Sequence, residues 1–370
     1  MASSIIDKAK SALGVKKGDD IIVAGEKVHS TGYGLMGLTW RAKPPSQEQS
    51  FEAMRQALES GANFWNGGEL YGTPERNSLH LLNEYFTKYP DDAKKVVISI
   101  KGGLKPGQMA PDGSAENTRR SIQECIDVLG GKKKLDLWES ARVDPNTAIE
   151  ITMKAASKFV DEGKLGGISL SECSEDTIRR AAKVAKIDAV EVEFSLWATE
   201  IRDNGVAKAC AELDIPIVAY SPLGRGFLTG QIKKPEDIPD DDFRKGLPRF
   251  QPGAFEKNLE LVQDLEGLAK KKSCTPGQVA VAWVKAQSGR SGMPTIIPIP
   301  GATTAERVKE NCVDVDLSEN DIKEIDGLIE SISIEGDRYG GHGAALMFGE
   351  TPELKEGELQ GTFQPVKNTA

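Results

Sequence analysis

Short runs of apolar and β-branched residues alternate along this chain with longer stretches in which apolar residues recur every three or four positions. The short runs are typical of buried strands, and the longer period is typical of amphipathic helices. In 47–60, for example, Phe51, Met54 and Ala57 fall on one helical face. Strands are predicted at 29–36, 63–66, 96–101, 135–139, 167–170, 189–193, 217–220 and 295–299, and helices at 47–60, 147–163, 203–213 and 255–272.

Strands that alternate with helices indicate an α/β fold, in which parallel strands are joined by crossover helices. The polar, proline-containing stretch 224–253 is predicted as a long loop after the seventh strand. We therefore expect a single-domain (β/α)8 TIM barrel at 29–335, preceded by an N-terminal arm at 1–28 and followed by a C-terminal tail at 336–370. A doubly wound open sheet is the competing arrangement.

The segment GYGLMG at 32–37 matches the glycine pattern of dinucleotide-binding folds, where it opens a helix that takes a pyrophosphate. Pro44 and Pro45 follow closely, and proline is excluded from helix interiors. We therefore predict a glycine-rich strand end near a ligand, with the first helix beginning only near Ser46.

Composition narrows the function classes. The chain has 47 basic and 56 acidic residues, a net charge of −9, which argues against a nucleic-acid partner. No apolar run reaches the length of a membrane span, and the N-terminus lacks a signal core. The five cysteines form no CxxC pair and the three histidines lie far apart, so neither a disulfide framework nor a metal site is expected. We expect a cytoplasmic protein and leave its oligomeric state open.

The carboxyl ends of the strands are where a barrel of this kind places its chemistry. Tyr71 follows the second predicted strand and Lys101 ends the third. A tyrosine is a poor proton donor at neutral pH, but a nearby ammonium lowers its pKa and makes it usable as an acid. The structural alternative is that Tyr71 only packs and that Lys101 extends into solvent.

Several segments resemble the aldo-keto reductase superfamily in order and spacing over about residues 30–335. They are FWNGGELYG, VVISIKGG, LDLWESARVDP, GKLGGISLSECS, VEVEFSLWATE, VAYSPLGRGFLTG and IIPIPGATTAERVKENC. Within this superfamily, the chain is most similar to the fungal pyridoxal reductases. The resemblance implies Tyr71 as general acid and Lys101 as the neighbour that lowers its pKa.

The family's catalytic aspartate and histidine are replaced in this sequence by Asn66 and Ala141. Asn66 can hydrogen-bond Lys101 but cannot neutralise it, so another carboxylate is needed, with Glu69 and Glu139 as candidates. Ala141 leaves space for a substituted pyridine ring. The predicted catalytic residues are Tyr71, Lys101 and Asn66, and the predicted substrate pocket is lined by Trp40, Ala141 and Arg142.

The resemblance implies a nicotinamide cofactor, with Tyr220 stacked on its ring. Thr303 or Thr304 and then Arg307 are spaced to meet a 2′-phosphate, which favours NADPH, although a solvated charged helix face is the alternative. In the tail, Arg338 and Tyr339 are candidates for covering the substrate. The predicted cofactor residues are Leu35, Met36, Ser171, Glu191, Tyr220, Ser221, Leu223, Arg225, Thr303, Thr304, Arg307 and Asn311.

The leading interpretation is an NADPH-dependent reductase of an aldehyde on a small aromatic ring, with pyridoxal reduced to pyridoxine. A general aryl-aldehyde reductase on the same scaffold is one alternative. The family's four catalytic positions hold Asp, Tyr, Lys and His, and two of them are changed here, so a non-catalytic nicotinamide-binding sensor is the other alternative.

Overall fold

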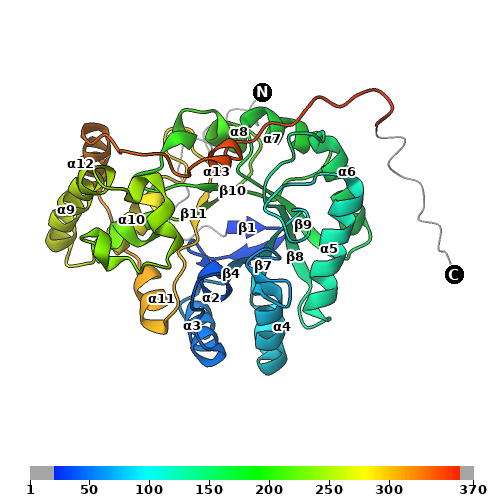
Figure 1. The fold of residues 1–370 in the computed structure, drawn as a ribbon, viewed down its shortest axis with the longest axis horizontal. Coiled ribbons are helices and arrows are strands. Elements are labelled where there is room, and N and C mark those ends of the chain that lie inside the picture. Colours follow the sequence, from blue (N-terminus) through cyan, green and yellow to red (C-terminus); the bar gives the residue numbers. More distant parts are fainter. Residues whose placement is uncertain (1–20, 359–370) are drawn as a thin grey trace, which may run out of the picture.

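Eight parallel strands form a closed ring in the computed structural model, which describes residues 21–358 (Figure 1). The strand order is β3-β4-β7-β8-β9-β10-β11-β12. A parallel bridge between Gly34 and Gly301 joins the two ends of this sheet. This closure confirms the predicted TIM barrel and excludes the open sheet.

The ring consists of β3 (Tyr33–Gly34), β4 (Phe64–Gly68), β7 (Val97–Gly102), β8 (Leu135–Ser140), β9 (Leu165–Ser171), β10 (Ala189–Glu193), β11 (Ile217–Tyr220) and β12 (Ile296–Pro298). The hairpins are β1 (Ile21–Val23) with β2 (Glu26–Val28), and β5 (Gly72–Thr73) with β6 (Arg76–Asn77). The helices are α2 (Met36–Thr39), α3 (Gln47–Glu59), α4 (Ser78–Lys88), α5 (Ala115–Leu129), α6 (Ile149–Asp161), α7 (Glu175–Ala182), α8 (Val206–Glu212), α9 (Ala254–Lys272), α10 (Pro276–Ala286), α11 (Ala305–Asn311), α12 (Glu319–Ser331) and α13 (His342–Ala345). Short 3-10 turns are η1 (Pro90–Lys94), η2 (Glu200–Arg202), η3 (Gly224–Thr229), η4 (Pro235–Asp237), η5 (Phe243–Gly246) and η6 (Pro248–Phe250).

The glycine motif at 32–37 serves barrel closure. A Cβ atom added at Gly32 would lie 2.6 Å from the Phe64 carbonyl oxygen, and one at Gly34 would lie 3.0 Å from that of Ile299. Only glycine therefore allows β3 to approach its neighbours this closely. The motif is a strand end, as predicted. The helix predicted to begin near Ser46 is confirmed as α3, which Ser46 caps by accepting from the Gln49 amide at 3.2 Å, but a shorter helix precedes it. The single turn α2 begins at Met36 and ends before the prolines.

The N-terminal hairpin β1–β2 covers the amino end of the barrel. Val23 and Val28 pack in one apolar cluster with residues such as Phe64 and Val97, near the starts of the ring strands. In Figure 1, β1 is seen within the ring of strands. The hairpin belongs to the segment predicted as an arm, whose first 20 residues lie outside the described part of the chain.

The C-terminal segment crosses the opposite mouth. In Figure 1 it runs from α12 past α13 toward α6 and α7. Cys173 and Gly349 form a parallel bridge, and the Gly349 amide donates to the Glu172 carbonyl at 2.7 Å. This segment therefore lies beside the strand ends where the predicted site residues are found.

Candidate active site

Three largely apolar strands of the ring each carry a buried charged residue that faces the barrel interior. In β7 (VISIKG), β8 (LDLWES) and β10 (AVEVE), Lys101, Glu139 and Glu191 are all buried and belong to the same alternating set. Lys101 pairs in register with Glu139 on the neighbouring strand. Since buried charges are costly unless they are paired, the barrel interior brings these three side chains together.

Lys101 is held between two glutamates. Its Nζ lies 3.0 Å from Glu139 Oε1 and makes a close ion pair with Glu191 Oε1. Asn66 contributes a third contact, with its Oδ1 3.5 Å from Lys101 Nζ. The Asn66 amide also donates to Glu191 Oε2 at 2.6 Å and to Glu139 Oε2 at 3.2 Å. Asn66 thus orients the two carboxylates that neutralise the lysine.

The ion pairs keep Lys101 protonated. Burial by itself lowers the pKa of Lys101, but Glu139 and Glu191 outweigh it, so the pKa is raised above its ordinary value. For Glu191, burial and the neighbouring Glu139 raise the pKa to about 8, and Lys101 opposes that rise without overcoming it. The place of the missing family aspartate beside Lys101 is therefore taken by carboxyl groups from β8 and β10.

Of the two candidate replacements for that aspartate, the structure brings only Glu139 to the lysine. Glu69 instead accepts from the Gly103 amide at 3.0 Å and pairs with Arg120 at 3.3 Å. Glu191, predicted only as a cofactor contact, is a second lysine partner that sequence reasoning missed. The signal was present in the VEVE alternation of β10, which places Glu191 on the same inward face as Lys101.

Tyr71 lies in the turn after β4 and is buried beside Lys101. The Lys101 Nζ is 6.0 Å from the Tyr71 ring centroid and 5.8 Å from that of Tyr220. Trp40 stacks on Tyr71 with ring centroids 5.5 Å apart, and 39% of Trp40 is exposed. The ammonium, the phenol and one aromatic wall therefore converge at the same mouth.

The expected net lowering of the Tyr71 pKa is not found in this structure. Burial raises the pKa of Tyr71 to about 12, and Lys101 opposes that rise without overcoming it. The negative charges of Glu191 and Glu139 add to the rise. Lys101 acts in the predicted direction, but desolvation of the phenolate is the larger effect.

The predicted nicotinamide contacts are at the ends of β9, β10 and β11. Ser171 is fully buried at the end of β9, and its hydroxyl lies 3.4 Å from Arg142 Nη1. Tyr220 donates from its hydroxyl to Glu172 Oε1 at 2.9 Å and lies 3.1 Å from the Tyr339 hydroxyl. Ala141 is buried at the end of β8, where the family histidine would stand.

The predicted pyrophosphate path follows β11. Ser221 and Arg225 both adopt left-handed backbone conformations, with φ of 51° and 56°, and Leu223 is buried between them. Arg225 pairs with Glu193 at 2.7 Å and donates to the Arg338 carbonyl at 2.7 Å. Across the ring, Leu35 is buried and caps α2, which Met36 begins.

A hollow of about 400 Å³ lies where α11 meets α3. Thr304 lines it and caps α11, accepting from the Arg307 amide at 3.4 Å. Arg307 is 46% exposed and pairs with Glu310, whereas Asn311 is on the buried side of the helix. The Thr303 carbonyl accepts from Gln49 Nε2 at 2.8 Å. Thr304 shares the lining of this hollow with three carboxylates, Glu48, Glu52 and Glu306, whereas Arg307 is not among its lining residues and lies on the exposed side of α11.

Arg338 anchors the C-terminal segment through an ion pair with Glu172. The sequence predicted it only as a residue that covers the substrate. It is 1% exposed, and its Nη1 and Nη2 each lie 3.1 Å from a different oxygen of Glu172. Although burial raises the pKa of Glu172, Arg338 and Arg142 outweigh it and lower that pKa. The C-terminal segment is thereby attached to the strand ends that carry the site.

Replacing Arg338 with Met should lower the free energy of unfolding by about 3–5 kcal/mol, because it leaves Glu172 buried without its partner. Denaturant unfolding of the purified protein measures this change. The matched control is Arg179→Met, which removes two partly exposed ion pairs, with Glu175 and Glu212, and should have little effect. Equal stability of the two variants would contradict a buried Arg338 anchor.

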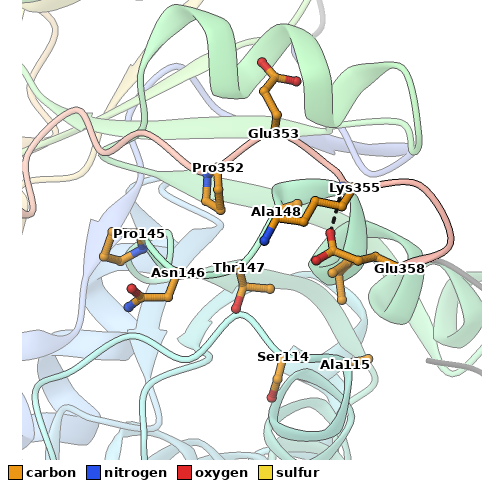
Figure 2. A pocket seen from close by; sticks show the side chains of 11 residues that line it. Ser114, Ala115, Pro145, Asn146, Thr147, Ala148, Pro352, Glu353, Lys355 and Glu358 are labelled. Carbon is orange, nitrogen blue, oxygen red and sulfur yellow. Dashed lines mark hydrogen bonds between the residues drawn. The ribbon is translucent and has the colours of Figure 1, made fainter. Parts of the chain in front are cut away.

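A second and larger hollow, about 520 Å³, lies away from these groups (Figure 2). Its walls come from the start of α5, the loop at 145–148 and residues 352–358 of the C-terminal segment. None of the predicted catalytic or cofactor residues lines it. Within residues 21–358, no three His, Cys, Asp or Glu side chains are grouped to hold a metal ion.

The sequence matches the model of the aldo/keto reductase family over residues 31–330. The chain belongs to this family. Family membership makes it an oxidoreductase, and its members use nicotinamide cofactors. A Gluconobacter oxydans glycerol dehydrogenase shares the fold, with a TM-score of 0.75 at 20% identity over 86% of this chain and 97% of that one.

Fungal members of the family are more similar to this chain. It is 42% identical to the Schizosaccharomyces pombe protein named "Probable pyridoxal reductase 2", over 86% of this chain and 96% of that protein. A Saccharomyces cerevisiae protein whose name also carries the term pyridoxal reductase is 41% identical, with 84% and 95% covered. The S. pombe aldo-keto reductase yakc, whose name specifies NADP(+), is 36% identical, with 90% and 97% covered.

Proposed function

We propose that this protein uses NADPH to reduce an aldehyde on a small aromatic ring, and that pyridoxal, which yields pyridoxine, is its substrate. The observation that carries the proposal is a lysine kept charged by two buried glutamates beside Tyr71. The names of the fungal relatives support the choice of pyridoxal.

In this reaction, bound NADPH supplies a hydride to the carbonyl carbon. Tyr71 donates its hydroxyl proton to the carbonyl oxygen, and Lys101 stabilises the phenolate that remains. Glu139 and Glu191 keep Lys101 charged, and Asn66 holds those carboxylates in place. Trp40 excludes water from one face of Tyr71. Because the Tyr71 pKa is about 12, its proton-donating form persists throughout the neutral range.

Arg307 should select NADPH over NADH, because its exposed guanidinium lies on α11 one turn after Thr304, which lines the hollow beside α3. Arg307→Gln should raise KM for NADPH by about 10- to 100-fold, the value of one charge-assisted contact, with a much smaller change for NADH. Steady-state kinetics with both cofactors measures this ratio. Arg290→Gln removes a comparable surface ion pair and serves as the control. A variant with an unchanged ratio would exclude this role for Arg307.

The function itself is tested by NADPH oxidation with pyridoxal, with pyridoxine identified by chromatography. Turnover that produces pyridoxine supports the proposal. Turnover of simple aryl aldehydes but not of pyridoxal would favour the general reductase, and tight NADPH binding without turnover would favour the sensor.

No helix in residues 21–358 is long and apolar enough to span a membrane. We also propose a cytoplasmic location, which rests on the composition.

A further inference from the structure

Arg142 is a half-buried guanidinium at the barrel mouth with no ion-pair partner in residues 21–358. It directly follows Ala141 after β8, and its Nη1 group donates to the Ala141 carbonyl at 2.5 Å and to Ser171 Oγ at 3.4 Å. Both acceptors are neutral. The Nε and Nη2 groups have no hydrogen-bond partner within the same residues, so one edge of the guanidinium is left free.

The other cations at this mouth have carboxylate partners, which Arg142 lacks within the described part of the chain. Glu172 interacts electrostatically with Arg142, but both oxygens of Glu172 already accept hydrogen bonds from Arg338. Three cations at this mouth each have a carboxylate partner: Lys101 with Glu139 and Glu191, Arg225 with Glu193, and Arg338 with Glu172. Among residues 21–358, Arg142 is thus the cation of this group without a direct carboxylate contact, and arginine cannot lose its charge by releasing a proton.

The free edge of Arg142 lies in the same mouth as the proposed acid. Burial dominates the raised pKa of Tyr71, and Arg142 is among the cations that oppose that rise. Ala141 contributes little bulk beside it, and Trp40 stacked on Tyr71 offers a flat wall. This surrounding suits an aromatic ring that carries a negative charge close to its reacting carbonyl.

We propose that Arg142 binds the ionised hydroxyl group of an aromatic aldehyde, at the ring position next to the carbonyl. The inference rests on the proposed reductase function and names its substrate class. The Nε and Nη2 groups form the fork with which arginine holds an oxyanion through two parallel hydrogen bonds. An aldehyde without this hydroxyl leaves the Nε and Nη2 groups without an acceptor.

The first test compares 3-hydroxypyridine-4-carboxaldehyde with pyridine-4-carboxaldehyde, which differ only in the hydroxyl group. The wild type should prefer the hydroxylated aldehyde in kcat/KM by about 10- to 100-fold, and Arg142→Gln should bring this ratio close to one. Arg142→Lys should keep part of the preference, and Arg179→Gln on α7 should keep all of it. If Arg142→Gln lowers kcat/KM equally for both aldehydes, the proposal is wrong.

A second test does not depend on turnover. Calorimetry with the NADP⁺-loaded protein compares 4-deoxypyridoxine, an unreactive ring that carries the hydroxyl, with its 3-O-methyl ether. The wild type should bind the free hydroxyl about 10-fold or more tightly than the ether, and Arg142→Gln should abolish that difference. Such binding without turnover would support the oxyanion site while removing the proposed reductase function. Equal binding of both rings by the wild type would overturn the site.

Discussion

Replacing Tyr71 with phenylalanine should reduce kcat for pyridoxal reduction by about 10²- to 10⁴-fold, the usual contribution of a positioned general acid. Phenylalanine preserves the stacking on Trp40 and removes only the hydroxyl. NADPH affinity should change little, since Tyr71 is placed among the catalytic groups rather than at the hollow beside α3. Steady-state kinetics and NADPH titration measure the two effects separately.

The control for this variant is Tyr89→Phe, which removes a phenol hydroxyl at the end of α4, where the ring packs on Phe51 and Tyr85. It should retain wild-type turnover. Loss of activity in both variants would point to a general effect on the fold. Turnover that survives in Tyr71→Phe would mean that the proton comes from another group.

Replacing Lys101 with methionine should produce an equally large loss, and it should also destabilise the protein. The variant removes the cation that stabilises the Tyr71 phenolate, so the Tyr71 pKa should rise further and kcat should fall by about 10²-fold or more. It also leaves Glu139 and Glu191 buried together without a counter-charge. Breaking a buried pair in this way costs about 3–5 kcal/mol of folding stability.

A double variant separates the two consequences. In Lys101→Met with Glu191→Gln, one of the stranded carboxylates becomes a neutral amide that Asn66 can still contact. Stability should recover in part, whereas kcat should stay low because the cation is still absent. Denaturant unfolding and pyridoxal kinetics on the same samples measure both quantities. Recovery of activity together with stability would mean that Lys101 is only a structural residue.

The barrel was predictable because its signals are local and repeated. Each strand is a short buried run such as VISIKG or IVAY, and each helix has a 3.6-residue apolar period, so their alternation fixes the order of the ring. The one-turn helix α2 was missed because four residues are too few to show a period. The hairpin β1–β2 was missed because each of its strands has only three residues.

The sequence predicted those site residues that lie at the carboxyl ends of strands. Tyr71 and Lys101 converge as expected, because parallel strands bring their carboxyl ends to one mouth. The partner of Lys101 was harder to predict, because the choice between Glu69 and Glu139 depends on which way each side chain points. Glu69 follows β4 and turns toward Arg120, whereas Glu139 faces into the barrel.

Two further features depend on contacts between distant segments. The anchoring of Arg338 on Glu172 joins residues 166 positions apart, and no local pattern marks it. The net direction of the Tyr71 pKa depends on how deeply the phenol is buried, and the folded structure shows that burial outweighs Lys101. The chemical type of each group can be read from the sequence, whereas the balance of burial and charge around Tyr71 depends on the fold.

The most direct measurement is a single turnover of the NADPH-loaded protein after rapid mixing with pyridoxal, followed by the loss of nicotinamide absorbance. The wild type should oxidise its bound NADPH in one phase and release pyridoxine. Tyr71→Phe, loaded with the same cofactor, should do so at least about 100-fold more slowly. Equal rates in the two proteins, or no oxidation in a wild type that holds NADPH, would contradict a reductase that uses Tyr71 as its acid.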